Sequence, residues 1–462
     1  MSASSGSEGS SERTVVLVLP SETYRAASFV DAAASLGAEV VVATDHAPPL
    51  AAEMEGRFVE VDLASPEASA QRIAALARRV GVEAVVGVDD QGVLTAAHAS
   101  ELLGLAHNPP DAVAATRDKA ELRSVLAAWD VPQPEFRIAP PGADIAALAA
   151  EVGLPCVVKP TSLSASTGVI RADSPAEAAQ VAERIRSILV DHGRSADEPL
   201  LVESFIGGAE VAVEGLLVDG DLDVLAVFDK PDPLDGPYFE ETIYVTPSRL
   251  DDIALNAVIS TTDVACRALG LREGPVHAEV RFTAEGPGAP RVVLLEVAAR
   301  SIGGLCSRVL RFGAGISLEE LILRHSLGLD TADLLRADGA GGVMMLPIPR
   351  SGVLTSVEGT EEASAVDGVV GLEITAPIGR TILALPEGGT YLGFLFARGD
   401  TPEQVEATLR EAHEALTFTI VDEAEPEPGA GSSEDVPPGT SSTEVMIDRT
   451  ERRGAGKVVT AS

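Results

Sequence analysis

The sequence predicts a parallel α/β domain followed by a longer α+β region. Apolar runs alternate with helix-length segments over residues 14–105, and such alternation is typical of a doubly wound parallel sheet. Residues 209–229 instead contain two consecutive strands joined by Asp219-Gly220, a dipeptide that favours a hairpin turn. A similar antiparallel pattern recurs at 275–299. At 462 residues the chain is long enough for two to four domains of about 100–200 residues each.

The elements of the first domain follow from continuous apolar runs and their breakers. TVVLVL (14–19) is typical of a strand buried on both faces, and a helix is expected at 22–36, ending at Gly37. Further strands are expected at 39–44, 57–63 and 84–90, with a helix at 66–80. The last strand ends in Asp89 and Asp90. Ligands gather at such strand ends, but helix capping also explains these acids.

The middle of the chain alternates helices with short strands. Helices are expected at 116–130, 175–190 and 251–269, and strands at 154–160, 168–171 and 199–206. The Ser- and Gly-rich loop 161–168 lies between the first two of these strands. Two long strands, 275–283 and 291–299, are expected to pair around a turn at 284–290, and further strands with a helix at 401–416 complete the ordered chain.

Composition limits the classes of function. The formal charge is −37, from 71 acidic and 34 basic residues, so nucleic acids and anionic membrane surfaces are not expected partners. Cys156, Cys266 and Cys306 are odd in number and widely spaced, which argues against disulfides and a zinc site. No transmembrane run and no signal peptide is recognisable, so cytoplasm is the expected location. Residues 1–12 and the acidic tail 423–462 are expected to be disordered.

No P-loop, GxGxxG, HExxH or GxSxG motif occurs in the sequence. The main chemical signal is instead a pair of acids on two neighbouring predicted strands. Glu279 lies in HAEVRF and Glu296 in LLEVAAR, and a hairpin would bring both carboxylates to one face. Such a pair suits Mg²⁺ with nucleotide phosphates, and Arg300 could hold phosphate or carboxylate oxygens beside it. An ordinary ribbon with exposed acids is the alternative interpretation.

Two weaker signals lie upstream. Lys159 ends the strand VVKP before loop 161–168, where a lysine and loop amides can bind phosphates, although it can also be a solvated charge. In LLVESFIGGAEVAVEG, the backbone near Phe205 could bind an adenine edge and Glu210 could accept from ribose hydroxyls.

In this order the motifs resemble the ATP-grasp superfamily. The matching segments are TRDK (116–119), VVKP (157–160), STGV (166–169), VESFIGGAEVAVE (202–214), HAEV (277–280) and LLEVAAR (294–300). FDKPDPLDGPYFEETIYVTPSRL (228–250) and EVAARSIGGL (296–305) resemble its carboxylate–amine ligase branch, which includes L-amino acid ligases. The resemblance implies a Rossmann-like domain at 13–110 and an ATP-grasp domain at 111–335. Its N-lobe would span about 111–200 and its central lobe about 201–335, followed by a β-rich C-terminal lobe at 336–422.

The resemblance also implies roles for individual residues. Lys119 and Lys159 match phosphate-binding lysines, Glu279 and Glu296 match magnesium ligands, and Arg300 matches the arginine that holds the acyl phosphate. The adenine and ribose contacts correspond to Glu203, Phe205, Ile206 and Glu210. Substrate or phosphate contacts in relatives correspond to Lys230, Glu241, Arg249 and His277, of which Lys230 is assigned to the nucleotide and His277 to catalysis. Ala298 departs from the family, where many members have an Asn that can ligate metal, and this leaves the number of metal ions in doubt.

The activity implied is an ATP- and Mg²⁺-dependent, ADP-forming ligation of a carboxylate to an amine through an acyl phosphate. Mn²⁺ is an alternative ion, amino acids are the expected substrates, and a homodimer is a further expectation. Bicarbonate or formate activation is an alternative with the same phosphate chemistry, and a non-catalytic nucleotide-binding protein is a third. The sequence does not identify the substrate pair or the general base.

Overall fold

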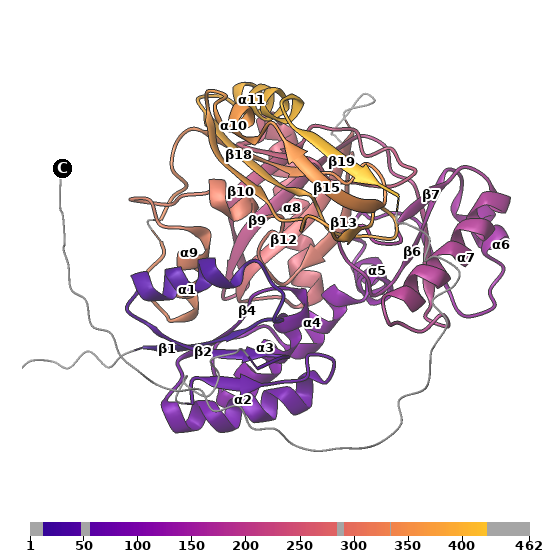
Figure 1. Ribbon diagram of the computed structural model, residues 1–462. Coiled ribbons are helices and arrows are strands. Elements are labelled where there is room, and N and C mark those ends of the chain that lie inside the picture. The colour runs from indigo at the N-terminus through magenta and orange to yellow at the C-terminus, as the bar shows by residue number, and fades with distance from the viewer. Residues whose placement is uncertain (1–12, 48–55, 284–290, 333, 423–462) are drawn as a thin grey trace, which may run out of the picture. The chain divides into compact units, whose positions relative to one another are not determined.

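A four-stranded parallel sheet forms the N-terminal part of the computed structural model, which describes residues 13–47, 56–283, 291–332 and 334–422. Its strand order is β3-β2-β1-β4, and every pairing is parallel. The strands are β1 (Thr14–Val18), β2 (Glu39–Thr44), β3 (Phe58–Glu60) and β4 (Ala84–Gly87). The helices are α1 (Ala26–Ser35), α2 (Pro66–Val80) and α3 (Asp90–Leu103). All five residues of β1 are buried, as expected for a strand covered on both faces (Figure 1).

A second, antiparallel sheet has the order β5-β8-β6-β7. Its strands are β5 (Phe136–Ala139), β6 (Cys156–Pro160), β7 (Ile170–Ala172) and β8 (Leu200–Ser204). Helices α6 (Ile145–Val152) and α7 (Pro175–Asp191) pack against it and share its apolar core. Two short helices, α4 (Pro110–Arg117) and α5 (Lys119–Ala128), precede this sheet in the chain.

An eight-stranded sheet carries most of the remaining chain, in the order β13-β12-β9-β10-β11-β14-β18-β16. The first five strands in sequence are β9 (Ala209–Val218), β10 (Asp221–Lys230), β11 (Ile243–Thr246), β12 (Gly274–Thr283) and β13 (Arg291–Ala298). The last three are β14 (Ala340–Leu346), β16 (Val369–Ile374) and β18 (Gly393–Gly399). Helices α8 (Asp252–Leu269) and α9 (Leu318–Ser326) and the 3₁₀ turn η2 (Cys306–Val309) pack against the sheet. In Figure 1 it runs from magenta β9 to orange β18.

Pairing of β11 with β14 joins the segment after residue 336 to this same sheet. A small sheet of order β17-β15-β19 accompanies it, built from β15 (Gly352–Glu358), β17 (Thr381–Ile382) and β19 (Thr417–Val421). Helices α10 (Thr360–Ser364) and α11 (Pro402–Glu414) complete this region. The predicted boundaries of the domains and lobes stay predictions. The eight-stranded sheet contains strands from both sides of the predicted boundary near residue 336.

Several local predictions meet the structure directly. Asp219 and Gly220 adopt positive φ angles of 53° and 91° between β9 and β10, as the predicted hairpin requires. The helix predicted at 116–130 is instead two helices, because the Asp118 carboxylate accepts from the amides of Ala120 and Glu121 and begins α5 at Lys119.

Asp89 caps α3, so capping accounts for this acid. The predicted disordered termini and the 284–290 turn lie outside the described residues. Among the described helices, none has the length and apolar character needed to cross a membrane.

Candidate active site

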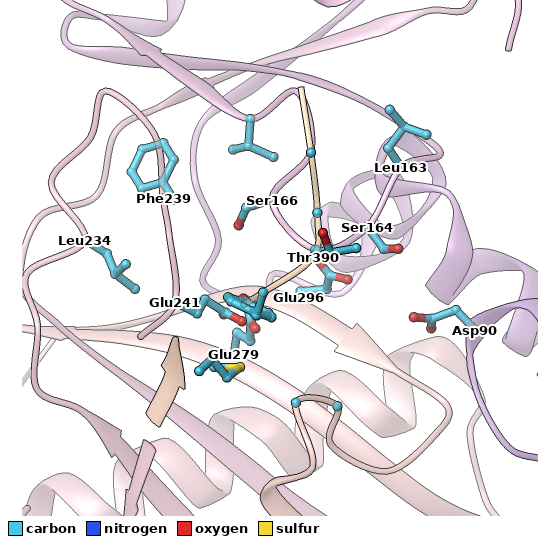
Figure 2. A pocket seen from close by; sticks show the side chains of 18 of the residues that line it. Asp90, Leu163, Ser164, Ser166, Leu234, Phe239, Glu241, Glu279, Glu296 and Thr390 are labelled. Atoms are coloured by element: carbon cyan, nitrogen blue, oxygen red, sulfur yellow. The ribbon is translucent and has the colours of Figure 1, made fainter. Parts of the chain in front are cut away.

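A cavity of about 890 Å³ is lined by residues from the sheet β5-β8-β6-β7, the eight-stranded sheet, the N-terminal domain and the segment 375–391. Figure 2 shows the carboxylates of Glu241, Glu279 and Glu296 at its centre. Leu234 and Phe239 lie on one side of them and Asp90 on the other. Most of the residues predicted to form the site line this cavity: Lys119, Lys159, Glu203, Phe205, Ile206, Glu210, His277, Glu279, Glu296 and Arg300.

Strand alternation explains the polar face that these residues share. On β12, His277, Glu279 and Arg281 are two residues apart, so their side chains leave the same face of the sheet. Glu279 lies directly opposite Glu296 on β13, and directly opposed residues also share a face. The register then shifts by one residue at Leu295, because Val280 is opposite Leu294. The two acids of the main sequence signal therefore form one cross-strand pair.

Lys159 lines the cavity and is buried in a series of ion pairs. Its Nζ lies 2.6 Å from Glu203 Oε2, and Arg123 Nε donates to Glu203 Oε1 at 2.5 Å. Burial lowers the pKa of Lys159 below its usual value, against the opposing influence of Glu203. Burial favours the neutral form of Glu203, but the Arg123 and Lys159 charges hold the pKa of this carboxyl below its usual value. These two ion pairs therefore keep Glu203 ionised and hold Lys159 in a fixed position.

Arg123 is a site residue that the sequence did not reveal. It is the largest side chain among the nearly inaccessible ones, and its Nη2 donates to the carbonyl of Leu295 at 2.7 Å. The guanidinium therefore connects the bulge before Glu296 to the Glu203–Lys159 pair. An arginine on an amphipathic helix normally faces solvent, so the local pattern offered no signal for this inward orientation.

We expect Arg123→Met to lower the free energy of unfolding by about 3 kcal/mol, because it leaves buried polar partners with fewer donors. Urea unfolding followed by circular dichroism measures this change. Arg137→Met is the matched control, since the Arg137–Glu151 pair is about half exposed and should contribute under about 1 kcal/mol. Equal destabilisation by the two substitutions would contradict the connecting role of Arg123.

Lys230 lies beneath the cavity and does not line it. Its Nζ donates to Glu210 Oε1 at 2.7 Å, to Glu279 Oε1 at 3.1 Å and to Glu241. Although burial opposes its charge, these carboxylates raise the pKa of Lys230 well above its usual value. The predicted nucleotide contact of Lys230 stays a prediction, and in the structure Lys230 acts on the cavity through the three acids that its ammonium contacts.

The acids around Lys230 differ in charge state. Burial raises the pKa of Glu241 to about 7. Burial also disfavours ionised Glu279, but Lys230 and His277 hold the pKa of Glu279 well below its usual value. Oxygens of Glu210, Glu241 and Glu279 lie within 4.8 Å of one another, as in a metal cluster, but the ammonium of Lys230 is already their cation. Glu279, whose pKa is lowered, is thus the member of this group that faces Glu296.

His277 adjoins both Glu279 and a second buried acid, Glu214. Its Nε2 lies 3.7 Å from Glu279 Oε1 and its Nδ1 lies 3.5 Å from Glu214 Oε2. Burial opposes the charged imidazole, yet hydrogen bonding to Glu214 and Glu279 raises the pKa of His277. Glu214 also accepts from the amide of Ile302 at 2.9 Å. Glu214 was not predicted as a site residue. Its even spacing of four residues from Glu210 on β9 was a sequence signal that both side chains leave the same face of the sheet.

Arg300 pairs with an acid of the N-terminal domain. Its Nε lies 2.9 Å from Asp90 Oδ1. Burial opposes the charge, but Asp90 raises the pKa of Arg300 above its usual value. Lys119 Nζ lies 3.5 Å from Glu296 Oε2 and donates to the carbonyl of Leu163 at 2.9 Å. Cations therefore flank the acid pair.

The segment predicted to contact adenine, around Phe205 and Ile206, has an apolar surface and backbone groups that are hydrogen-bonded within the protein. The Phe205 ring stacks near Phe239, with centroids 6.3 Å apart. The amide of Phe205 donates to the carbonyl of Pro155 at 3.0 Å, and the carbonyl of Ile206 accepts from Arg281 at 2.6 Å. These two groups have protein partners in the structure, and the predicted adenine contact of the backbone around Phe205 and Ile206 stays a prediction.

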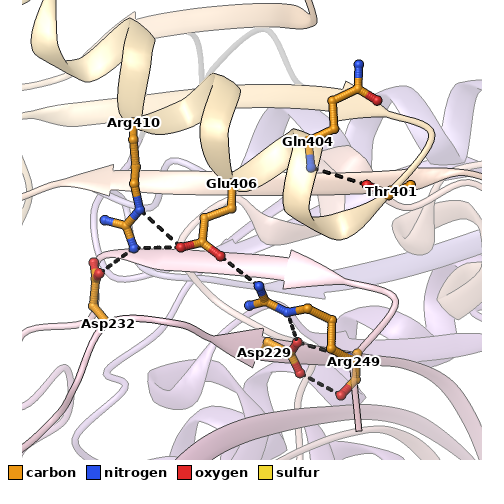
Figure 3. Close-up of polar contacts among 8 residues, drawn as sticks. Asp229, Asp232, Arg249, Thr401, Gln404, Glu406 and Arg410 are labelled. Carbon is orange, nitrogen blue, oxygen red and sulfur yellow. Dashed lines mark hydrogen bonds and ion pairs between the residues drawn. The ribbon is translucent and has the colours of Figure 1, made fainter.

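Arg249 does not line the cavity, in contrast to its predicted contact with substrate or phosphate. Its Nε donates to Asp229 Oδ2 and its Nη1 to Glu406 Oε2, each at 2.8 Å. Arg410 of α11 connects Glu406 to Asp232 through further ion pairs (Figure 3). The two aspartates flank Lys230 in sequence, so this network fixes the end of β10 against α11.

Three family models match successive parts of the chain. An ATP-grasp N-terminal domain matches residues 30–107, an ATP-grasp domain matches 152–309, and an L-amino acid ligase C-terminal domain 2 matches 344–421. These matches cover β2, β3 and β4 of the parallel sheet, most of the polar cavity face, and β16 and β18 of the large sheet.

Individual relatives agree with the models. The alanine–anticapsin ligase of Bacillus subtilis is 28% identical over 269 residues, which are 55% of this chain and 56% of that protein. A D-alanine–D-alanine ligase of Aromatoleum aromaticum is 30% identical over 216 residues, 43% of this chain and 67% of that protein. The chain spans 63% or less of each of the first four curated relatives.

A crystal structure of an L-amino acid ligase from Bacillus licheniformis superposes with a TM-score of 0.73 at 24% identity, covering 89% of this chain and 99% of that one. This similarity shows the fold, and it confirms the predicted combination of a Rossmann-like sheet with α+β lobes. The chain belongs to the ATP-grasp superfamily and, within it, to the L-amino acid ligase-like branch.

Proposed function

We propose that the chain is an ATP- and Mg²⁺-dependent ligase that joins a carboxylate to an amine through an acyl phosphate, releasing ADP. The observation that carries this proposal is the cross-strand pair Glu279–Glu296, flanked in one cavity by Lys119, Lys159 and Arg300. Relatives named as alanine–anticapsin and D-alanine–D-alanine ligases support amino acids as the small-molecule substrates.

The donor set fits a magnesium ion. Glu279 and Glu296 offer hard carboxylate oxygens from opposed positions, and Mg²⁺ commonly takes one or two carboxylates together with phosphate oxygens. These residues would hold the ion, which supplies a Lewis acid that neutralises charge on the phosphates. Mn²⁺ prefers the same ligands and is the alternative. The adjoining Lys230 keeps Glu279 ionised, as ligation requires.

In this proposal, the other residues of the cavity neutralise charge on the phosphates, hold the acyl phosphate and exclude water. The substrate carboxylate attacks the γ-phosphorus of ATP, and the bond to ADP breaks while Lys119 and Lys159 neutralise the developing charge. Arg300 holds an oxygen of the acyl phosphate, and the amine attacks the acyl carbon so that inorganic phosphate leaves. Loop 161–168 contributes Leu163, Ser164 and Ser166 to the cavity wall and excludes water from this labile intermediate.

A substrate screen tests the proposal. The purified chain with MgATP should form ADP only when amino acids are present, and the product mass should equal the two substrates minus water. Hydroxylamine should intercept the acyl phosphate as a hydroxamate. ADP formation that depends on bicarbonate or formate instead would favour the alternative reactions, and ATP binding without turnover on any substrate would favour a non-catalytic role.

A further inference from the structure

One end of the cavity is an apolar chamber, defined here by Tyr24, Met345, Tyr391 and Phe394. The Tyr24 and Phe394 ring centroids lie 5.8 Å apart, and those of Tyr391 and Phe394 lie 6.1 Å apart. Met345 and Phe394 are almost fully buried, whereas Tyr24 is 49% exposed. A large aromatic side chain that stays half exposed within a cavity is typical of a binding surface.

The floor of the apolar chamber is the segment that follows Arg300. Gly304 has a φ of +59° and its amide donates to the Tyr24 hydroxyl at 3.0 Å, which fixes the orientation of that ring. A Cβ at Gly304 would lie 2.5 Å from Met345 Sδ, so floor and wall are already in tight contact. Because only three residues separate Arg300 from Gly304, the chamber adjoins the proposed position of the reacting acyl group.

Two arginines near this end, Arg25 and Arg300, are already paired within the protein. Arg25 is buried and donates to the carbonyls of Val88 and Ser301 at 2.7 and 3.3 Å and to the Ser301 hydroxyl. Arg300 is paired with Asp90. A polar or charged ligand group entering the chamber would lose its hydration without gaining these partners, whereas an apolar group would gain contacts with the rings and with Met345.

We propose that the apolar chamber binds the side chain of one of the two joined amino acids and selects aromatic or branched aliphatic side chains over charged ones. This inference rests on the proposed ligase function for its turnover test, but not for its binding test. A pocket of this kind discriminates by about 10-fold or more for each methylene that it accepts or excludes.

Two variants change the size of the chamber in opposite directions. Gly303→Ala adds a methyl group whose nearest neighbour is the Tyr24 hydroxyl at 3.8 Å, an ordinary contact that should leave the fold intact. Phe394→Leu removes part of the aromatic wall. Trp129→Leu is the matched control, since Trp129 is 58% exposed and is not among the cavity-lining residues.

The readout is kcat/KM for phenylalanine, leucine, alanine, aspartate and lysine, each tested as either partner with product masses recorded. The natural chain should prefer phenylalanine and leucine over aspartate and lysine by at least ~10-fold at one of the two positions. Gly303→Ala should lower the phenylalanine-to-alanine ratio by about 10-fold, Phe394→Leu should lower the preference for phenylalanine over leucine, and Trp129→Leu should leave both ratios unchanged.

Direct binding separates failure of the chamber from failure of the ligase. Isothermal titration with the same amino acids in the presence of Mg²⁺ and a non-hydrolysable ATP analogue requires no turnover. Apolar-selective binding that Gly303→Ala weakens supports the chamber even if no ADP forms. Equal affinity for aspartate, lysine and phenylalanine, or variants that leave the ratios unchanged, would overturn the inference.

Discussion

Lys159→Met is expected to reduce ADP formation by about 10²–10³-fold, because it removes a cation positioned for the transferred phosphoryl group. The fold should survive, since Glu203 keeps its 2.5 Å ion pair with Arg123. The measurement is steady-state ADP release with saturating MgATP and an amino acid pair, together with a melting temperature for each variant.

Two further variants sharpen the Lys159 experiment. Arg137→Met removes a cation from an exposed pair in the same sheet and should keep full activity. Lys159→Arg should remain at least ~10-fold impaired, because the position is buried and shaped for a compact ammonium rather than a planar guanidinium. Activity within twofold of the natural chain in Lys159→Met would remove this residue from the proposed mechanism.

Glu296→Gln should lower turnover by about 10³-fold and raise the Mg²⁺ concentration needed for half-maximal rate. Glutamine has nearly the same shape, so the change isolates the loss of one anionic oxygen ligand opposite Glu279. ADP release is measured across a magnesium titration at fixed ATP.

Glu151→Gln is the control for Glu296→Gln, because Glu151 is an exposed acid whose only recorded ion pair among the described residues is with Arg137. It should change neither rate nor magnesium dependence. A Glu296→Gln enzyme with an unaltered magnesium profile would show that the metal is held elsewhere, and it would count against the assignment of the acid pair.

The polar face of β12 was predictable from sequence because strand alternation is local. The order His277, Ala278, Glu279, Val280, Arg281 indicates which side chains share a face, and the turn expected near 284–290 brought Glu296 close to Glu279. The bulge at Leu295 that sets Glu296 directly opposite Glu279 was not predictable from this pattern. Pairing of β11 with β14 was not predictable in this way, since about a hundred residues separate the strands and local pattern does not name a distant partner.

Side-chain orientation explains the other differences. Lys230 and Arg249 have the residue types of ligand contacts, but their partners are acids that approach from β9, β12 and α11 only in the folded chain. The scarcity of lysine was nevertheless a sequence signal for the site residues.

The sequence has only four lysines, at 119, 159, 230 and 457, and the three within the described residues all lie in or beneath the cavity. Where arginine serves nearly every other basic position, a retained lysine indicates a need for a small ammonium.

The continuous eight-stranded sheet has a consequence for engineering this protein. Glu279 on β12 and the chamber residues Met345 and Phe394 on β14 and β18 belong to one hydrogen-bonded framework, whereas Lys159 is carried by a separate sheet. Grafting a relative's C-terminal segment to alter the proposed substrate selectivity would therefore disturb the ladder that holds Glu279 and Glu296, the proposed metal ligands, and point substitutions around the chamber are the safer route.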